Sequence, residues 1–206
     1  SLLLVIGIPL LAWLIGNAVG QKVGKEMSGG SNSSTTAETS VEDNTQKEDN
    51  PEYTKIFTER NIIKPVNITF GLNKASFAKV EVSEEGLETI DCYDIAYDAS
   101  TGAISNMAES LYIDVSSYTE EELESLDTAM QEEYHAYQGE NFTATFETPS
   151  LSSYYRVSLE YKNLDDEDVV KNLEDQGLIT TTGTGTGGLG IKATENSLLS
   201  QGYVKK

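Results

Sequence analysis

A glycine-rich stretch, "TTTGTGTGGLG" at residues 180–190, contains the most recognisable ligand-binding motif in this chain. Gly183, Gly185 and Gly188 form the pattern G-x-G-x-x-G, which cradles phosphate groups when a strand precedes it and a helix follows. Here only the short "LIT" precedes it, and no helix is expected to begin at Gly188. A flexible loop is therefore the preferred interpretation, and we expect no cofactor.

Two single residues have catalytic potential. His135 is the one histidine and stands at the end of a predicted helix. Ser-His-Asp or Cys-His catalysis would require it to meet a nucleophile across the fold, whereas its favourable interaction with a helix C-terminus is a simpler explanation. Cys92 is the one cysteine and lies in an alternating apolar stretch, so we expect a small core residue. A single cysteine also excludes an intrachain disulfide and a thiolate zinc cluster.

Carboxylates are far more numerous than cations. The chain has 34 Asp and Glu against 14 Lys and Arg, a net charge of -20, and the interval from Val80 to Tyr155 contains no Lys or Arg. Such a surface repels polyanions, which excludes DNA and RNA as partners. Runs such as "LDDEDVV" lack the spacing of a calcium-binding loop, so a solvated acidic face is preferred and no metal site is expected. Paired carboxylates for glycoside hydrolysis stay open, because any pairing among so many acids is uninformative.

The strands that must position these residues follow from apolar alternation. Residues 66–72 and 77–82 are predicted strands, the second with Ala78, Val80 and Val82 on one side. "TIDCYDIAYD" and a strand ending in "SLYIDV" flank the turn "ASTG" and are predicted to form a hairpin. Residues 141–147 and 154–162 are predicted to be two further strands. Most of the eleven tyrosines fall on inward positions, so core packing is preferred over a recognition surface.

Three helices are predicted. Thr119 and Glu122 form a capping box that begins a long helix, which Gly139 ends in a left-handed conformation. Its apolar stripe consists of Leu123, Leu126, Met130, Tyr134 and Tyr137. Two short helices follow, the first with Asp165 as cap and Gly177 as stop, the second with Thr194 as cap and Gly202 as stop. The order predicts an α+β domain over residues 53–206, with an antiparallel sheet packed against one long and two short helices.

The first twenty residues contain no charge, which suits a membrane-spanning helix. Cleavage of a signal peptide after Gly20 is the alternative, and a lipoprotein leader is excluded because no Cys follows the apolar run. We favour a retained anchor, followed at residues 21–52 by a disordered tether rich in Ser, Thr, Gly and Glu. The triplets at Asn32, Asn67 and Asn141 matter only for eukaryotic secretion.

A family resemblance covers roughly residues 66–206. The hairpin with "SLYIDV", the helix "TEEELESLDTAMQEEYHAYQG", two strands and the terminal "TENSLLSQGYVKK" resemble the YehR-like family of small bacterial lipoproteins. The resemblance implies an extracytoplasmic α+β domain with no assigned activity, and it carries over no functional residues. The chain departs from the family in lacking the lipobox Cys.

These observations lead to one leading hypothesis and two alternatives. We expect a non-enzymatic binding or structural module of the bacterial cell envelope, held by residues 1–20 as a single-pass protein with its C-terminal domain outside the cell. Its acidic surface would select cationic partners. The alternatives are a carboxylate-based hydrolase, and a sensor domain of a longer membrane protein that extends before Ser1.

Overall fold

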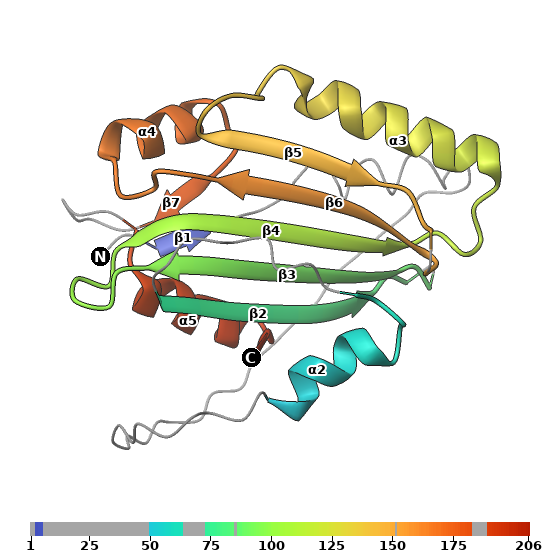
Figure 1. Cartoon of the computed structure of the whole chain (residues 1–206), viewed down its shortest axis with the longest axis horizontal. Helices are drawn as coiled ribbons and strands as arrows, with labels where there is room; N and C mark the ends of the chain where they lie inside the picture. Colours follow the sequence, from blue (N-terminus) through green and yellow to red (C-terminus); the bar gives the residue numbers. More distant parts are fainter. Residues whose placement is uncertain (1–2, 6–49, 64–72, 85, 151, 183–188) are drawn as a thin grey trace, which may run out of the picture. The chain divides into compact units, whose positions relative to one another are not determined.

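A six-stranded antiparallel sheet forms the frame of the computed structural model, which describes residues 3–5, 50–63, 73–84, 86–150, 152–182 and 189–206 (Figure 1). The strand order is β5-β6-β4-β3-β2-β8. The strands are β2 (Asn73–Val82), β3 (Glu88–Tyr97), β4 (Ile104–Asp114), β5 (Phe142–Glu147), β6 (Tyr154–Tyr161) and β8 (Val204–Lys205). The predicted α+β class with an antiparallel sheet is therefore confirmed.

Four helices accompany the sheet within the described residues: α2 (Pro51–Thr58), α3 (Glu120–His135), α4 (Glu167–Asp175) and α5 (Ile191–Ser200). A separate antiparallel pair joins β1 (Leu3–Val5) to β7 (Thr180–Thr182). The sequence predicted one long and two short helices, and α2 is the additional one. Asn50 caps it by accepting from the Glu52 amide, and Pro51 occupies the first turn, where its missing N–H costs nothing.

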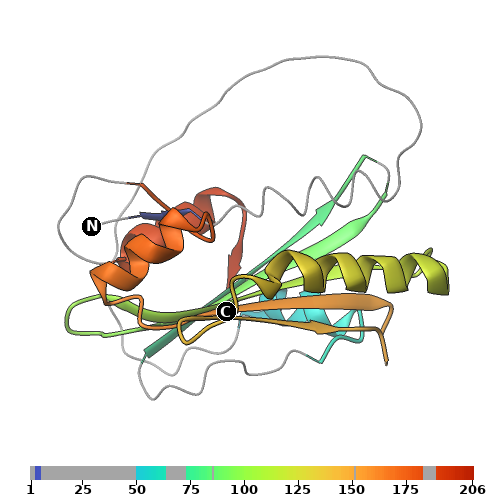
Figure 2. The same cartoon turned by 90° about the horizontal axis from the view of Figure 1, so that it is seen from above.

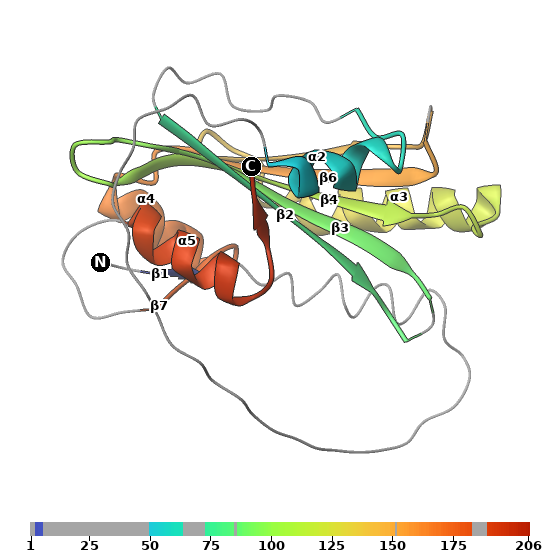
Figure 3. The same cartoon turned by 90° about the horizontal axis from the view of Figure 1, so that it is seen from below.

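Both faces of the sheet are covered. The register sets Tyr93 opposite Glu109 on one face, and Cys92 opposite Ser110 on the other, because directly paired residues point to the same side. We call the first the helical face, since side chains of α3 and of the α4 and α5 segments contact it. We call the second the α2 face, where Tyr53 and Phe57 pack on Ile90, Cys92 and Tyr112. Figures 2 and 3 show α2 on the opposite side of the sheet from α4 and α5.

The long helix begins as predicted. The Thr119 hydroxyl accepts from the Glu122 amide, and the Glu122 carboxylate accepts from the Thr119 amide at 2.8 Å. Leu126, Met130 and Tyr134 are buried, and the Tyr134 ring lies 6.1 Å from that of Phe142 in β5. The apolar stripe therefore lies on the helical face of the sheet.

Three predicted helix boundaries are wrong. The long helix ends at His135, before Gly139. Gly139 is not left-handed, because its amide donates to the Phe142 carbonyl at the start of β5. Asp166, not Asp165, caps α4 by accepting from two amides of its first turn. Thr194 lies inside α5, which begins after Gly190 because the Ile191 amide is bonded to the β3–β4 turn at Gly102. Gly177 and Gly202 have positive φ and end α4 and α5 as predicted.

Several predictions concern residues outside the described part of the chain. They are the strand at 66–72, the tether up to residue 49, the triplets at Asn32 and Asn67, and the glycine pattern at 183–188. Within the predicted span at 1–20, only Leu3–Val5 are described, and they form a strand. Among the described residues, no helix has the length and apolar character needed to cross a bilayer.

The first described residues of the main segment lie beside the C-terminus. Asn50 donates from Nδ2 to the Lys205 carbonyl at 2.9 Å, and β8 pairs with the edge of β2. The Lys205 ammonium forms an ion pair with Glu195 of α5. The cap of α2, the last strand and α5 are thus connected at one edge of the sheet.

Candidate binding site and a buried acidic cluster

An open depression of about 210 Å³ lies on the α2 face, between the chain that follows α2 and strands β4 to β6. Its lining is mostly polar: Asn61, Ile62, Ile63, Tyr112, Glu147, Thr148, Ser150, Ser152, Tyr154 and Arg156. Small-molecule sites are usually concave and contain polar groups that fix the orientation of the ligand, although most have a more apolar lining than this one. We therefore take this depression as the candidate binding site.

The turn after α2 shapes one wall. Asn61 has φ of 54°, a left-handed value that Asn tolerates better than most residues, and the Ile62 amide donates back to the Phe57 carbonyl. This turn sends Ile62 into the core and leaves Ile63 at the rim with 79% of its surface exposed. The wall therefore presents apolar surface opposite the polar strands.

Arg156 supplies the cation of the site. Its side chain is only 12% exposed, and Nη2 donates to Oε1 of Glu147 at 2.5 Å. Glu147 lies directly opposite on β5 and is 60% exposed. The Nε of Arg156 is buried and has no hydrogen-bond partner among the described residues. Half of the guanidinium's donor fork is thus unused, although Arg and carboxylates often pair through two parallel bonds.

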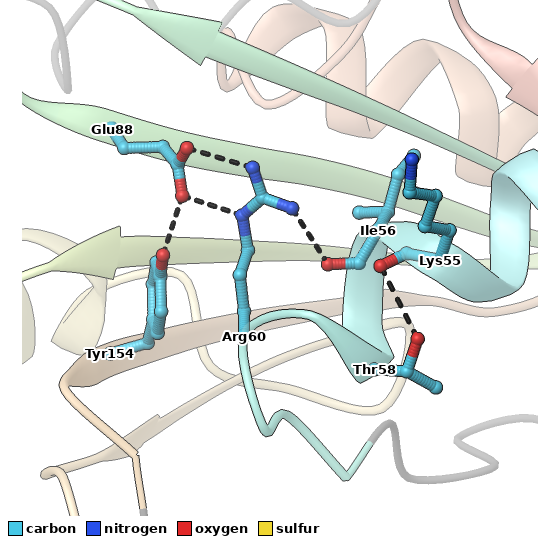
Figure 4. A network of polar contacts seen from close by, with 6 residues as sticks. All are labelled: Lys55, Ile56, Thr58, Arg60, Glu88 and Tyr154. Atoms are coloured by element: carbon cyan, nitrogen blue, oxygen red, sulfur yellow. Dashed lines mark hydrogen bonds and ion pairs between the residues drawn. The ribbon is translucent and has the colours of Figure 1, made fainter.

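A network around Glu88 braces the Tyr154 wall (Figure 4). Arg60 donates from Nε and Nη2 to the two oxygens of Glu88, at 2.6 and 2.8 Å, and from Nη1 to the Ile56 carbonyl. The Tyr154 hydroxyl donates to the same carboxylate. Hydrogen bonds from Arg60 lower the pKa of Glu88, against the opposing effect of desolvation. The network connects α2 to β3 and β6 and positions Tyr154, which lines the depression.

The helical face contains a different kind of site, which we call the acidic cluster: Asp91, Glu109, Tyr93 and Tyr203. Glu109 is 1% exposed and accepts from the Tyr93 hydroxyl at 3.0 Å. Asp91 is half-buried as a residue, but its carboxyl group is enclosed and accepts from Tyr203. The register places Asp91 and Glu109 as diagonal neighbours across β3 and β4. One oxygen of each has no hydrogen-bond partner among the described residues.

Burial dominates the electrostatics of this cluster. It raises the pKa of Asp91 to about 6, and the Tyr203 and Tyr93 hydroxyls only partly oppose this. It also raises the pKa of Glu109 well above its ordinary value, and the nearby charge of Asp91 raises it further. Neither carboxyl lines the depression described above. Burial in this cluster therefore favours the protonated form of both acids.

The outer side of α3 is the most acidic exposed surface of a described helix. Its exposed glutamates are Glu120, Glu121, Glu122, Glu124 and Glu132, and the helix contains no Lys or Arg. Asp127 is half-buried and accepts from the Tyr155 hydroxyl at 2.8 Å, which ties the helix to β6. These exposed glutamates are therefore on the solvent side of α3.

The residues singled out from the sequence do not meet in one place. Cys92 is fully buried on the α2 face, which confirms a core residue. His135 is exposed in the last turn of α3, as predicted. Oδ1 of Asn141 accepts from the side-chain Nδ2 of Asn163. Across the described ranges, no group of three or more His, Cys, Asp or Glu side chains is placed to hold a metal ion.

Sequence reasoning missed Arg156, Glu147, Asp91 and Glu109. A signal existed for the acidic pair. Asp91 lies two residues before Tyr93 and so shares the core-facing side of its strand with Tyr93 and Ile95. Glu109 likewise shares one side of its strand with Met107 and Leu111. Polar residues with the parity of core residues mark buried polar sites. No local signal identified the pairing of Arg156 with Glu147, since it depends on the β5–β6 register.

Comparisons with known proteins add one finding. No protein-family model matches the chain, and no curated protein sequence matches it. One similar solved structure is an NMR structure of a protein from Streptococcus pneumoniae TIGR4, at 13% sequence identity and a TM-score of 0.39. The match covers 83% of this chain and 100% of that protein's chain.

Proposed function

We propose that this chain is a non-enzymatic binding module of the bacterial cell envelope, anchored by residues 1–20 and exposed outside the cell. Its acidic surface would select cationic partners. The observation that carries the proposal is the outer side of α3, where five glutamates are exposed without a single Lys or Arg on the helix. Such a surface attracts cations over roughly the Debye length and repels anionic polymers.

A binding role is favoured over a catalytic one by where the acids lie. Catalytic carboxylates need perturbed pKa values and access to a substrate. Asp91 and Glu109 have raised pKa values, but they are enclosed between the sheet and its helices. The open depression is lined by hydroxyls and one ion pair rather than by two close carboxylates. This arrangement supports binding.

The family and the location belong to the same proposal. The resemblance to YehR-like lipoproteins supports an extracytoplasmic domain, and the uncharged residues 1–20 support a membrane anchor. Secretion after cleavage near Gly20 is the alternative location. Fractionation of cells that express the chain with its natural upstream sequence would separate the two: an anchored protein stays with membranes after a high-salt wash, and a cleaved one does not.

The test of cationic selectivity is a titration with peptides of opposite charge. A lysine-rich peptide should bind the full chain, and a glutamate-rich peptide of equal length should not. Raising the salt from about 50 to about 500 mM should weaken the lysine peptide about tenfold or more. Affinity that does not change with salt would contradict the proposal.

A matched pair of variants locates the binding surface. Glu124→Gln with Glu132→Gln removes two charges from α3, and Asp165→Asn with Asp175→Asn removes two exposed charges from the α4 region. The first double variant should lose several-fold more affinity for the lysine peptide than the second. Equal losses would mean that net charge alone, and not the α3 surface, determines binding.

The hydrolase and sensor alternatives have their own tests. If a substrate could reach the acidic cluster and be hydrolysed there, Asp91→Asn with Glu109→Gln would abolish that activity but leave peptide binding unchanged. A sensor role requires further protein before Ser1, and the complete reading frame would reveal it.

A further inference from the structure

The ion pair in the depression has unequal partners. Arg156 is almost enclosed, whereas Glu147 is 60% exposed and contributes a single hydrogen bond. The exposed Glu147 carboxylate can exchange this bond for bonds to water, whereas the enclosed guanidinium cannot. The buried Nε of Arg156 has no hydrogen-bond partner among the described residues, so Glu147 satisfies this guanidinium incompletely.

We propose that the depression binds a small hydroxylated monocarboxylate, whose carboxylate replaces Glu147 on Arg156. This site is distinct from the acidic surface of α3. A ligand carboxylate can accept from Nε and Nη2 together, which is the geometry that the arginine fork favours. Glu147 is fixed to β5 directly opposite Arg156 and makes only one of these bonds.

The walls select the rest of the ligand. Thr148, Ser150 and Ser152 are among the lining residues, and their hydroxyls can both donate to and accept from ligand hydroxyls. The volume of about 210 Å³ corresponds to about seven water molecules, which suits a small organic acid. The net charge of -20 disfavours multiply charged anions such as phosphate, so a single negative charge fits best.

Three small probes separate the parts of this proposal. Glycerate has one carboxylate and two hydroxyls, glycerol lacks the carboxylate, and propionate lacks the hydroxyls. Glycerate should bind the full chain saturably and shift the NMR signal of the Arg156 Nε–H group. Glycerol should not bind, and propionate should bind at least several-fold more weakly, because the wall hydroxyls would then lack partners. Equal binding of propionate would overturn the selection by hydroxyls.

Variants test the exchange of partners. Arg156→Ala should abolish glycerate binding, and Arg156→Lys should weaken it about tenfold or more, because Lys cannot form the fork. Glu147→Gln should strengthen binding several-fold, since it removes the competing charge. Lys171→Ala on α4 removes one exposed cation away from the depression and should change nothing.

The outcomes are decisive in each direction. No saturable glycerate binding, or binding that persists in a folded Arg156→Ala variant, would overturn the proposal. Unchanged affinity in Glu147→Gln would overturn the replacement of Glu147. Should Arg156→Ala fail to fold, Arg156→Lys and Glu147→Gln still decide the question. Binding of the lysine peptide to α3 is measured separately, so either proposal can fail alone.

Discussion

Acidic side chains on the two faces of the sheet have pKa values shifted in opposite directions. On the α2 face, Glu88 receives two hydrogen bonds from Arg60 and one from Tyr154, and its pKa is lowered. On the helical face, the side-chain hydrogen bonds that Asp91 and Glu109 accept come from tyrosines, and the pKa values of both acids are raised. A tyrosine hydroxyl offers a hydrogen bond but no charge, so it compensates for less of the cost of burial.

This difference gives the two faces opposite dependences on pH. Glu88 holds its proton less tightly in the folded state, so its contribution to stability is present above its unfolded pKa and is lost as the pH falls. Asp91 and Glu109 hold their protons more tightly in the folded state. Their contribution is complete below their unfolded pKa values and is lost as the pH rises through the folded values, which for Asp91 is about 6.

The largest expected effect breaks the charge compensation on the α2 face. Arg60→Ala leaves Glu88 without its cation. The loss is costly because the side chains of Arg60 and Glu88 are only 20% and 23% exposed. The free energy of unfolding should fall by about 3 kcal/mol, as measured by chemical denaturation at neutral pH. Arg60→Ala with Glu88→Gln should recover part of this loss. A loss in the single variant below about 1 kcal/mol would mean that the network adds little.

The next largest effect is expected from removing the buried charge of Asp91 on the helical face. Asp91→Asn keeps an acceptor for Tyr203 but removes the charge, so at about pH 8 it should stabilise the fold by about 2 kcal/mol. At about pH 4 the gain should nearly disappear, because the wild-type carboxyl is then protonated. Denaturation curves across this range test both statements. A constant difference between the two proteins would show that the pKa of Asp91 is not raised.

A smaller effect concerns the start of the long helix. Thr119→Ala removes the hydroxyl that accepts from the Glu122 amide and should cost about 1 kcal/mol of stability. Thr119→Ser keeps the acceptor and should cost much less. Thermal melts of the two variants give the comparison. The result separates local capping from the electrostatics of either face.

The smallest effect is expected from an exposed ion pair on α2. Lys55 and Glu59 lie one helical turn apart with side chains 68% and 55% exposed. Lys55→Ala should change the free energy of unfolding by only about 0.3 kcal/mol, since solvent screens the pair. Its contrast with Arg60→Ala, on the same helical segment, measures how much partial burial strengthens an ion pair. A loss comparable to that of Arg60→Ala would contradict this contrast.

Local patterns were enough to predict most of the frame. The capping box at Thr119, the turn between β3 and β4, and the strand predicted at residues 154–162 all depend on neighbours in sequence, and all are confirmed. The predicted stop at Gly139 and cap at Thr194 were wrong because long-range hydrogen bonds fix those segments. Helix α2 was missed because it follows a polar stretch, although the Asn50–Pro51 pair is a helix-start signal.

The candidate site was less predictable than the frame. Its lining comes from the chain after α2, from β4, and from both ends of the β5–β6 connection. These pieces meet only when α2 docks on the sheet, and no spacing in the sequence encodes that contact. The acidic cluster was nearer to prediction, because Asp91 and Glu109 share the parity of core residues on adjacent strands.

The hydrogen bond from Asn50 to the Lys205 carbonyl makes the fold nearly circular. The two ends of this part of the chain lie close together, so a circular permutation should require little movement of the fold. A short linker could join residue 206 to residue 50, with new termini opened in the exposed turn that Ser83 and Gly86 form between β2 and β3. Because the C-terminus contacts Asn50, a bulky C-terminal fusion would disturb the cap of α2.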